Sequence, residues 1–118
     1  MAAPTPAQHK GAAAEALAAN FLAARRVSIV ARNWRCRMGE IDLICHDGST
    51  LVFVEVRSRA SGRFGSAADS ITARKQARLV AAAQHYLATL KRVPPCRFDA
   101  ILIDGEAEPQ WLKHIIEL

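Results

Sequence analysis

Residues 39–59 read GEIDLICHDGSTLVFVEVRSR, and this stretch predicts the centre of the fold. Two apolar runs are joined at Asp47-Gly48, a pair of residues that is typical of a tight β-hairpin turn. We therefore expect one strand at 39–46 and a second strand, antiparallel to the first, at 50–58. Both faces of the run LVFVEV are apolar, which is typical of a central strand covered by helices on both sides.

Carboxylates interrupt both apolar runs, at Glu40, Asp42 and Glu55. A buried carboxylate costs free energy unless it is paired or binds a metal. If the turn centres on the Asp-Gly pair, Glu40 lies opposite Glu55 and Asp42 lies opposite Phe53. Opposite and alternate residues share a face of the sheet, so we expect these acids and Arg57 on one side. They can bind one divalent cation, or they can form a cross-strand network of ion pairs.

The remaining sequence predicts an α-β-β-β-α-β-β order. The elements outside the hairpin are expected as a helix at 6–26, a strand at 27–34, a helix from 66 or 69 to 90, and strands at 97–104 and 111–117. The long second helix is a crossover connection, which allows strand 97–104 to lie parallel to strand 50–58. The predicted fold class is therefore α/β, with a central mixed sheet flanked by helices.

The first helix carries an apolar stripe at three- and four-residue spacing, made of Ala14, Leu17, Ala18, Phe21 and Leu22. At ~100° per residue, Glu15 falls at the border of this stripe. It can therefore point along the sheet, or it can be an ordinary exposed glutamate.

Length and composition restrict the functional classes. The 118 residues are sufficient for one domain at 9–118, after a Pro- and Ala-rich start at 1–8 that we expect to be frayed. A net charge of +5 fits a polyanionic partner such as nucleic acid, or a solvated basic surface. Three scattered cysteines and no long apolar run indicate a cytoplasmic protein with reduced thiols and no membrane partner. No glycine-rich phosphate loop is present, and we expect no small-molecule cofactor.

Several motifs together resemble the YraN-like family of small bacterial proteins. They are the hairpin GEIDLIC-DG-LVFVEVRSR, an upstream G-x-x-x-E-x-L-A, and the downstream I-x-x-x-K-x-x-R and RFD. The resemblance covers roughly Lys10 to Leu118. It implies a restriction-endonuclease-like core and a site similar to those of PD-(D/E)xK nucleases and archaeal Holliday-junction resolvases.

The resemblance also implies which residues form the site. Its acids fall on Glu15, Asp42 and Glu55, which would bind Mg²⁺ or Mn²⁺, and its basic position falls on Arg57. These four are the expected catalytic residues. Arg57 stands where the nuclease signature has lysine, and arginine is a poorer proton relay because it does not deprotonate.

Five basic residues are expected to contact the nucleic-acid backbone: Arg59, Arg63, Arg74, Lys75 and Arg78. The lysine of the family's second helix falls on Lys75. Arg59 and Arg63 lie at or in the glycine-containing segment 60–65, which we expect to be a mobile loop beside the site. Basic residues at the start of a helix oppose its macrodipole, which favours an anion nearby.

The favoured hypothesis is a Mg²⁺-dependent endonuclease-like protein that acts on DNA, including branched or structured DNA. One alternative is a nucleic-acid-binding module that keeps the nuclease fold without turnover. The other is a dimeric interaction protein in which the acids form ordinary ion pairs. A homodimer is also expected from the resemblance, since resolvase-like proteins act as dimers.

Overall fold

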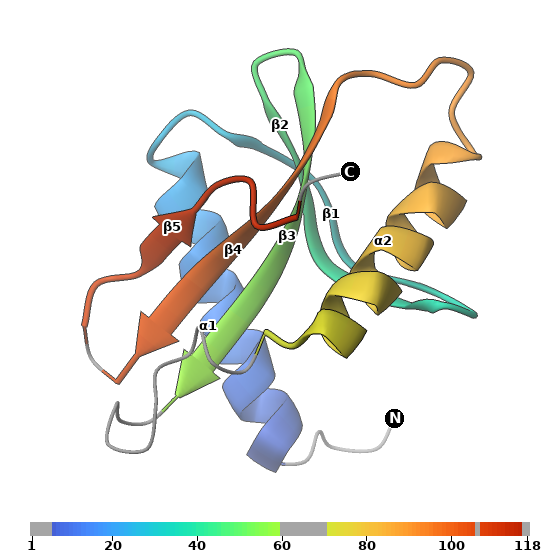
Figure 1. The fold of residues 1–118 in the computed structure, drawn as a ribbon. Helices are drawn as coiled ribbons and strands as arrows, with labels where there is room; N and C mark the ends of the chain where they lie inside the picture. Colours follow the sequence, from blue (N-terminus) through green and yellow to red (C-terminus); the bar gives the residue numbers. More distant parts are fainter. Residues whose placement is uncertain (1–5, 60–70, 106, 117–118) are drawn as a thin grey trace, which may run out of the picture.

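The computed structural model of the chain describes residues 6–59, 71–105 and 107–116. These residues form two helices and five strands in the order α-β-β-β-α-β-β (Figure 1). Their bounds are α1 Pro6–Ala23, β1 Ser28–Cys36, β2 Gly39–Asp47, β3 Thr50–Arg59, α2 Ala73–Leu87, β4 Cys96–Asp104 and β5 Gln110–Leu112. The predicted α/β class and element order are confirmed, and the arrangement is consistent with a restriction-endonuclease-like core.

The predicted bounds were wrong at the ends of both helices and at the end of the last strand. Helix α1 ends at Ala23 rather than at residue 26. Helix α2 ends at Leu87 rather than at residue 90. Strand β5 ends at Leu112 rather than at residue 117, and His114 after it has a left-handed backbone with φ +57°.

Helix α2 begins at Ala73, after Thr72, whose Oγ1 accepts a 3.2 Å hydrogen bond from the backbone N–H of Lys75. The expected helical residues 66–70, the expected loop at 60–65 and residues 1–5 of the expected frayed start lie outside the described residues. Neither described helix is long and apolar enough to cross a lipid bilayer.

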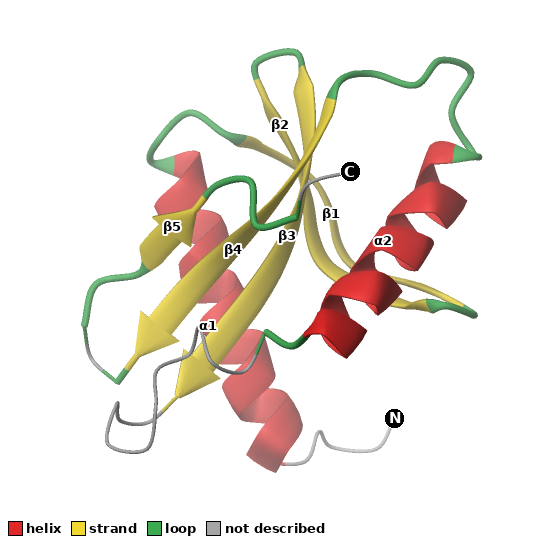
Figure 2. Ribbon diagram, in the orientation of Figure 1, coloured by secondary structure: helices red, strands yellow, loops and turns green. Residues whose placement is uncertain are grey.

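The five described strands form one sheet in the order β1-β2-β3-β4-β5. Neighbouring strands are antiparallel except β3 and β4, which pair in parallel as predicted. Figure 2 shows α1 on one side of this sheet and α2 on the other. Strand β3 is the middle strand, and its residues 51–56 are all buried.

The two largest apolar clusters of the described residues lie between the sheet and the helices. The cluster under α1 contains Ala18, Ala19 and Leu22 from the helix and Leu43, Cys45, Val52, Val54, Val56, Ile101 and Ile103 from the sheet. The cluster under α2 contains Leu79, Ala82 and Ala83 from the helix and Ile41, Ile44, Leu51, Phe53 and Phe98 from the sheet. The alternation of β3 residues between these clusters confirms that β3 is covered on both faces.

The buried face of α1 confirms four residues of the predicted stripe, since Ala18 and Leu22 are buried and Ala14 and Phe21 pack against the same cluster. Leu17 is 46% exposed, whereas Ala19, which was not in the stripe, is 1% exposed. The buried residues Ala18, Ala19 and Leu22 lie three, four and seven positions after Glu15, which is the spacing of a single helix face. Glu15 therefore belongs to the sheet-facing side of α1 and is half-buried.

A buried carboxylate holds the end of the described chain against β4. Asp99 is fully buried and accepts hydrogen bonds from Arg97, from the indole N–H of Trp111 and from the backbone N–H of His114. Arg97 also donates to Asp47 near the β2–β3 turn. The RFD motif of the sequence is therefore a structural clasp that joins β4 to β5 and to the hairpin.

Candidate functional site

The register of the β2–β3 hairpin differs from the predicted one. Ile44 pairs with Phe53 and Asp47 pairs with Thr50, so Asp42 is not opposite Phe53. The expected register was wrong because the two turn residues are Gly48 and Ser49 rather than Asp47 and Gly48. Gly48 has φ +63°, a conformation that glycine adopts at little cost.

Asp42 stands where β2 separates from β3. The β2–β3 ladder ends at the pair Leu43–Val54, whereas β1 and β2 remain paired as far as Cys36–Gly39. Just beyond the end of the ladder, Asp42 Oδ2 accepts a 2.8 Å hydrogen bond from the backbone N–H of Val56. The carboxylate thus occupies the opening between two diverging strands.

A break in the side-chain alternation turns Asp42 toward α1. Ile41 and Ile44 both pack in the α2-side cluster, although residues three apart on a regular strand lie on opposite faces. Asn33 lies in β1, opposite this break in β2, and has φ +52°, a left-handed conformation that asparagine tolerates better than most residues. The expectation that Asp42 shares a face with Phe53 was therefore wrong.

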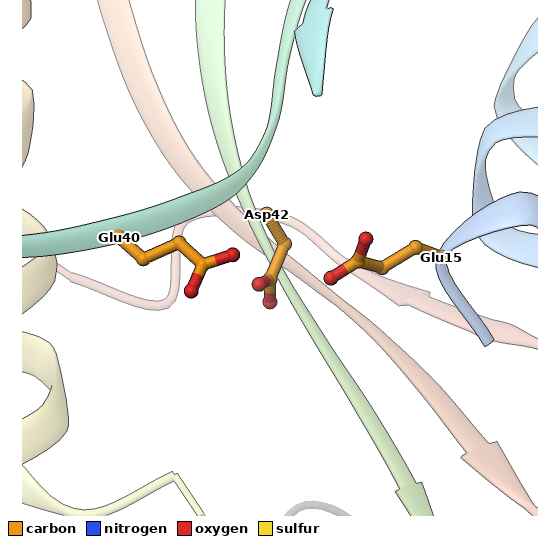
Figure 3. A group of neighbouring side chains, drawn as sticks. All are labelled: Glu15, Glu40 and Asp42. Carbon is orange, nitrogen blue, oxygen red and sulfur yellow. The ribbon is translucent and has the colours of Figure 1, made fainter. Parts of the chain in front are cut away.

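Three carboxylates converge at this break. Glu15 from α1 and Glu40 and Asp42 from β2 each have an oxygen within 4.8 Å of the others (Figure 3). The structure thus brings together two of the three predicted metal ligands, Glu15 and Asp42. The third member of the cluster is Glu40, which was not among the predicted ligands. We call Glu15, Glu40 and Asp42 the acid cluster.

Burial and mutual repulsion disfavour charge on the acid cluster. Burial, followed by the charge of Asp42, raises the pKa of Glu15, while a hydrogen bond with Asn33 opposes this shift. Burial also raises the pKa of Asp42, against the hydrogen bond from Val56. The charge of Glu40 adds to the repulsion on both Glu15 and Asp42. A cation at this position would offset this repulsion.

The other two predicted catalytic residues lie on β3. Glu55 is buried and forms an ion pair with Arg57, and the two lie on the same face because they are two residues apart. Burial raises the pKa of Glu55 to about 7; the nearby charge of Asp42 adds to the shift, and Arg57 and Lys75 oppose it. Glu55 therefore lies in the electrostatic field of Asp42, but it is not a member of the acid cluster.

Arg57 has an unused donor. Its Nε atom is buried and has no hydrogen-bond partner within the described ranges of the chain. Buried donors are nearly always satisfied in folded proteins, so this one calls for an acceptor that the described residues do not supply. An oxygen of a bound phosphate would be such an acceptor.

The predicted backbone-binding residues divide into two groups. Arg74, Lys75 and Arg78 lie on α2, with Arg74 and Arg78 exposed and Lys75 half-buried. Lys75 acts electrostatically on Glu55, so the start of α2 lies beside the site. Arg63 and the side chain of Arg59 lie outside the described residues.

Sequence reasoning missed Glu40 as a ligand and Asn33 as a support for Glu15. The signal for Glu40 was present, since it lies two residues before Asp42 in the same predicted strand. Asn33 interrupts a run rich in β-branched residues, which was itself a sign of irregular backbone.

Comparison with known proteins places the chain in a family. The model of "Uncharacterised protein family UPF0102" matches residues 14–103. A UPF0102 protein of Nitrosomonas europaea is 51% identical, over 94% of this chain and 96% of its own length. A second from Nitrosococcus oceani is 55% identical, over 92% of this chain and 93% of its own length. A third from Cupriavidus taiwanensis is 52% identical, over 93% of this chain and 84% of its own length. These matches are consistent with the YraN-like resemblance, and the chain belongs to the UPF0102 family.

Proposed function

We propose that this protein is a metal-dependent nuclease that hydrolyses phosphodiester bonds in DNA. The observation that carries the proposal is the acid cluster, which lies beside the Glu55–Arg57 ion pair at the point where β2 leaves β3. The three carboxylates repel one another, which favours a bound cation. The unused buried donor of Arg57 favours a phosphate as the neighbouring ligand. The basic start of α2 supports the same interpretation.

The acid cluster fits Mg²⁺ or Mn²⁺ by its donor chemistry. These hard cations prefer carboxylate oxygens and retain several waters, so a partly open group of three acids suits them. Glu15 and Asp42 would hold the ion with Glu40. Glu55 lies outside this group, and the charge of Asp42 acts on it. When bound, the ion would supply positive charge that activates water and neutralises charge on the phosphate.

The chain's own residues would then orient the substrate. Arg57 would donate Nε–H to a phosphate oxygen while Glu55 keeps the guanidinium in place through its ion pair. The hydrogen bond from Val56 fixes Asp42 at the opening of the sheet. Arg74 and Arg78, exposed on α2, would hold the flanking backbone.

Cleavage assays on a panel of labelled substrates test this function. The panel contains duplex, forked, four-way-junction and single-stranded DNA, each with Mg²⁺, with Mn²⁺ or with EDTA. We expect metal-dependent products with at least one DNA, loss of those products with Asp42→Asn, and retention with Glu108→Gln. Glu108 is an exposed acid in the β4–β5 connection, outside the acid cluster, and therefore controls for removal of one negative charge.

Absence of products from every substrate with both metals would overturn the proposal. Equal cleavage by the wild-type protein and Asp42→Asn would overturn the assignment of the site to the acid cluster. It would show that the activity does not depend on Asp42, as expected of a contaminating nuclease.

The ion pair between Glu55 and Arg57 favours one other function, a nucleic-acid-binding module without turnover. An arginine cannot relay a proton, and its pairing neutralises one of the predicted ligands. This second candidate predicts salt-dependent binding of the same DNA panel without products in either metal.

A further inference from the structure

The β1–β2 hairpin extends beyond the rest of the sheet. Its strands stay paired from Trp34–Ile41 to Cys36–Gly39, whereas the ladder to β3 has already ended at Leu43–Val54. In Figure 1 this hairpin passes behind α2 and projects beyond it. We call residues 34–41 the arm.

The tip of the arm combines positive charge with an exposed apolar side chain. Arg37 and Met38 form the turn, and Met38 is 49% exposed and belongs to neither the α1-side nor the α2-side cluster. Arg37 is exposed, and the side chain of Arg35 is 75% exposed. Arg35 forms an ion pair with Glu40. The side chains of Arg37 and Met38 add little to the packing of the domain and are available to a partner.

The arm connects the acid cluster to the basic surface of α2. A Cβ added to Gly39 would lie 3.7 Å from Cβ and from the carbonyl oxygen of Arg78, so the arm touches α2 next to an exposed arginine. Helix α2 contains no acidic residue. Glu40 of the acid cluster also lies on the arm, one residue after Gly39 in the strand that follows the turn.

We infer that the arm enters the major groove of double-helical DNA beside the phosphate that the acid cluster acts on. This inference rests on the proposed function for the identity of the partner and names the form of DNA that the site takes. A two-stranded ribbon fits the major groove of B-form DNA, about 12 Å wide. The deep, narrow major groove of A-form RNA does not admit side chains, so the arm selects DNA over RNA.

Each side chain of the tip has a role in this arrangement. Arg37 contacts a phosphate at the groove edge, and Met38 packs against base edges such as thymine methyl groups. Arg78 contacts the backbone on the α2 side of the same groove. The charge of these residues is opposite to that of the partner, and no acidic residue of α2 opposes it.

Fluorescence anisotropy in EDTA tests the arm separately from catalysis, because no metal is present to support cleavage. The probes are a duplex DNA, a duplex RNA and a single-stranded DNA of one sequence. We expect the wild-type protein to bind duplex DNA most tightly.

We expect Arg37→Ala to weaken that binding roughly eightfold at ~0.1 M salt and to lower the salt slope by about 1. We expect Met38→Ala to weaken it without changing the slope. Arg92→Ala removes an exposed cation from the α2–β4 connection, outside the arm, and should change binding less than Arg37→Ala.

Three results would overturn the inference. The first is equal binding of duplex DNA by the wild-type protein and Arg37→Ala. The second is equal affinity of the wild-type protein for duplex RNA and duplex DNA. The third is a loss of DNA affinity with Arg92→Ala as large as that with Arg37→Ala. A shift of Arg37→Ala or Met38→Ala from dimer to monomer in sedimentation, with unchanged DNA binding, would assign the tip to self-association instead. Failure of cleavage with intact, arm-dependent duplex binding would contradict the proposed nuclease and leave the arm supported.

Discussion

Asp42 Oδ2 accepts a 2.8 Å hydrogen bond from the backbone N–H of Val56, just past the last ladder pair between β2 and β3. One carboxylate therefore has two tasks. It satisfies a backbone donor that the diverging strands would otherwise leave unpaired, and it brings negative charge to the acid cluster.

Substitution of Asp42 should separate these two tasks. Asp42→Asn keeps an oxygen for the Val56 N–H, so we expect the free energy of unfolding to change little or to rise, because burial disfavours the charge that Asn lacks. Asp42→Ala leaves the donor unsatisfied and should lower that free energy by about 1–3 kcal/mol relative to Asn. Urea unfolding measures both, and equal stability of the two variants would contradict the role of the hydrogen bond.

Stability should depend on pH through Glu55. Its pKa is raised from 4.5 to about 7, so the folded protein binds this proton more tightly than the unfolded chain does. The free energy of unfolding that Glu55 contributes therefore falls as pH rises from 4.5 to about 7, by about 3 kcal/mol at most.

Glu55→Gln should remove this dependence. The variant should be more stable than the wild-type protein at pH 8 and similar to it near pH 4, in urea titrations without metal. A difference between the two proteins that stays constant across this pH range would show that Glu55 does not titrate in the way described.

The left-handed backbone of Asn33 predicts an unusual order of stabilities. At φ +52° a Cβ-bearing residue without a local hydrogen-bonding group is strained by about 1 kcal/mol, whereas glycine is not. Asn33→Ala should therefore unfold at lower urea than Asn33→Gly, although glycine is usually destabilising in a strand. The usual order, with alanine the more stable, would contradict the backbone break on which the position of Asp42 depends.

The Asp99 clasp should be the most sensitive polar site in the fold. Asp99→Ala leaves the Arg97 guanidinium and the Trp111 indole N–H without their buried acceptor, and we expect a loss of about 3–5 kcal/mol. Asp47→Ala removes the other carboxylate that Arg97 contacts, at a position whose side chain is 33% exposed, and should cost less than about 1 kcal/mol. Comparable losses in urea unfolding would show that Asp99 is not the centre of the clasp.

The sequence predicted most of the fold because its strongest signals are local. The Asp-Gly pair, the two-sided apolar run at 51–56 and the crossover helix were sufficient to predict a hairpin with a central strand and the parallel β3–β4 pairing. The register was wrong by two residues because an Asp-Gly pair marks a turn without fixing which two residues form it.

The site was predicted less completely because its geometry depends on irregular backbone. A strictly alternating strand directs Asp42 to the α2 side, and the break near Asn33 reverses this. The apolar stripe of α1 was wrong only at Leu17 and omitted Ala19, because Leu17 is more hydrophobic although Ala19 is the residue that packs against the sheet. The correct buried face could have been predicted from Ala18, Ala19 and Leu22, which lie three, four and seven residues after Glu15.

Titration calorimetry with Mn²⁺ near pH 8 tests the central claim most directly, because it requires neither a substrate nor turnover. We expect saturable binding by the wild-type protein and Glu108→Gln, at least tenfold weaker binding by Glu15→Gln, and none that can be measured with Asp42→Asn. Equal binding by all four proteins, or no binding by the wild-type protein, would contradict the claim that the acid cluster is a metal site.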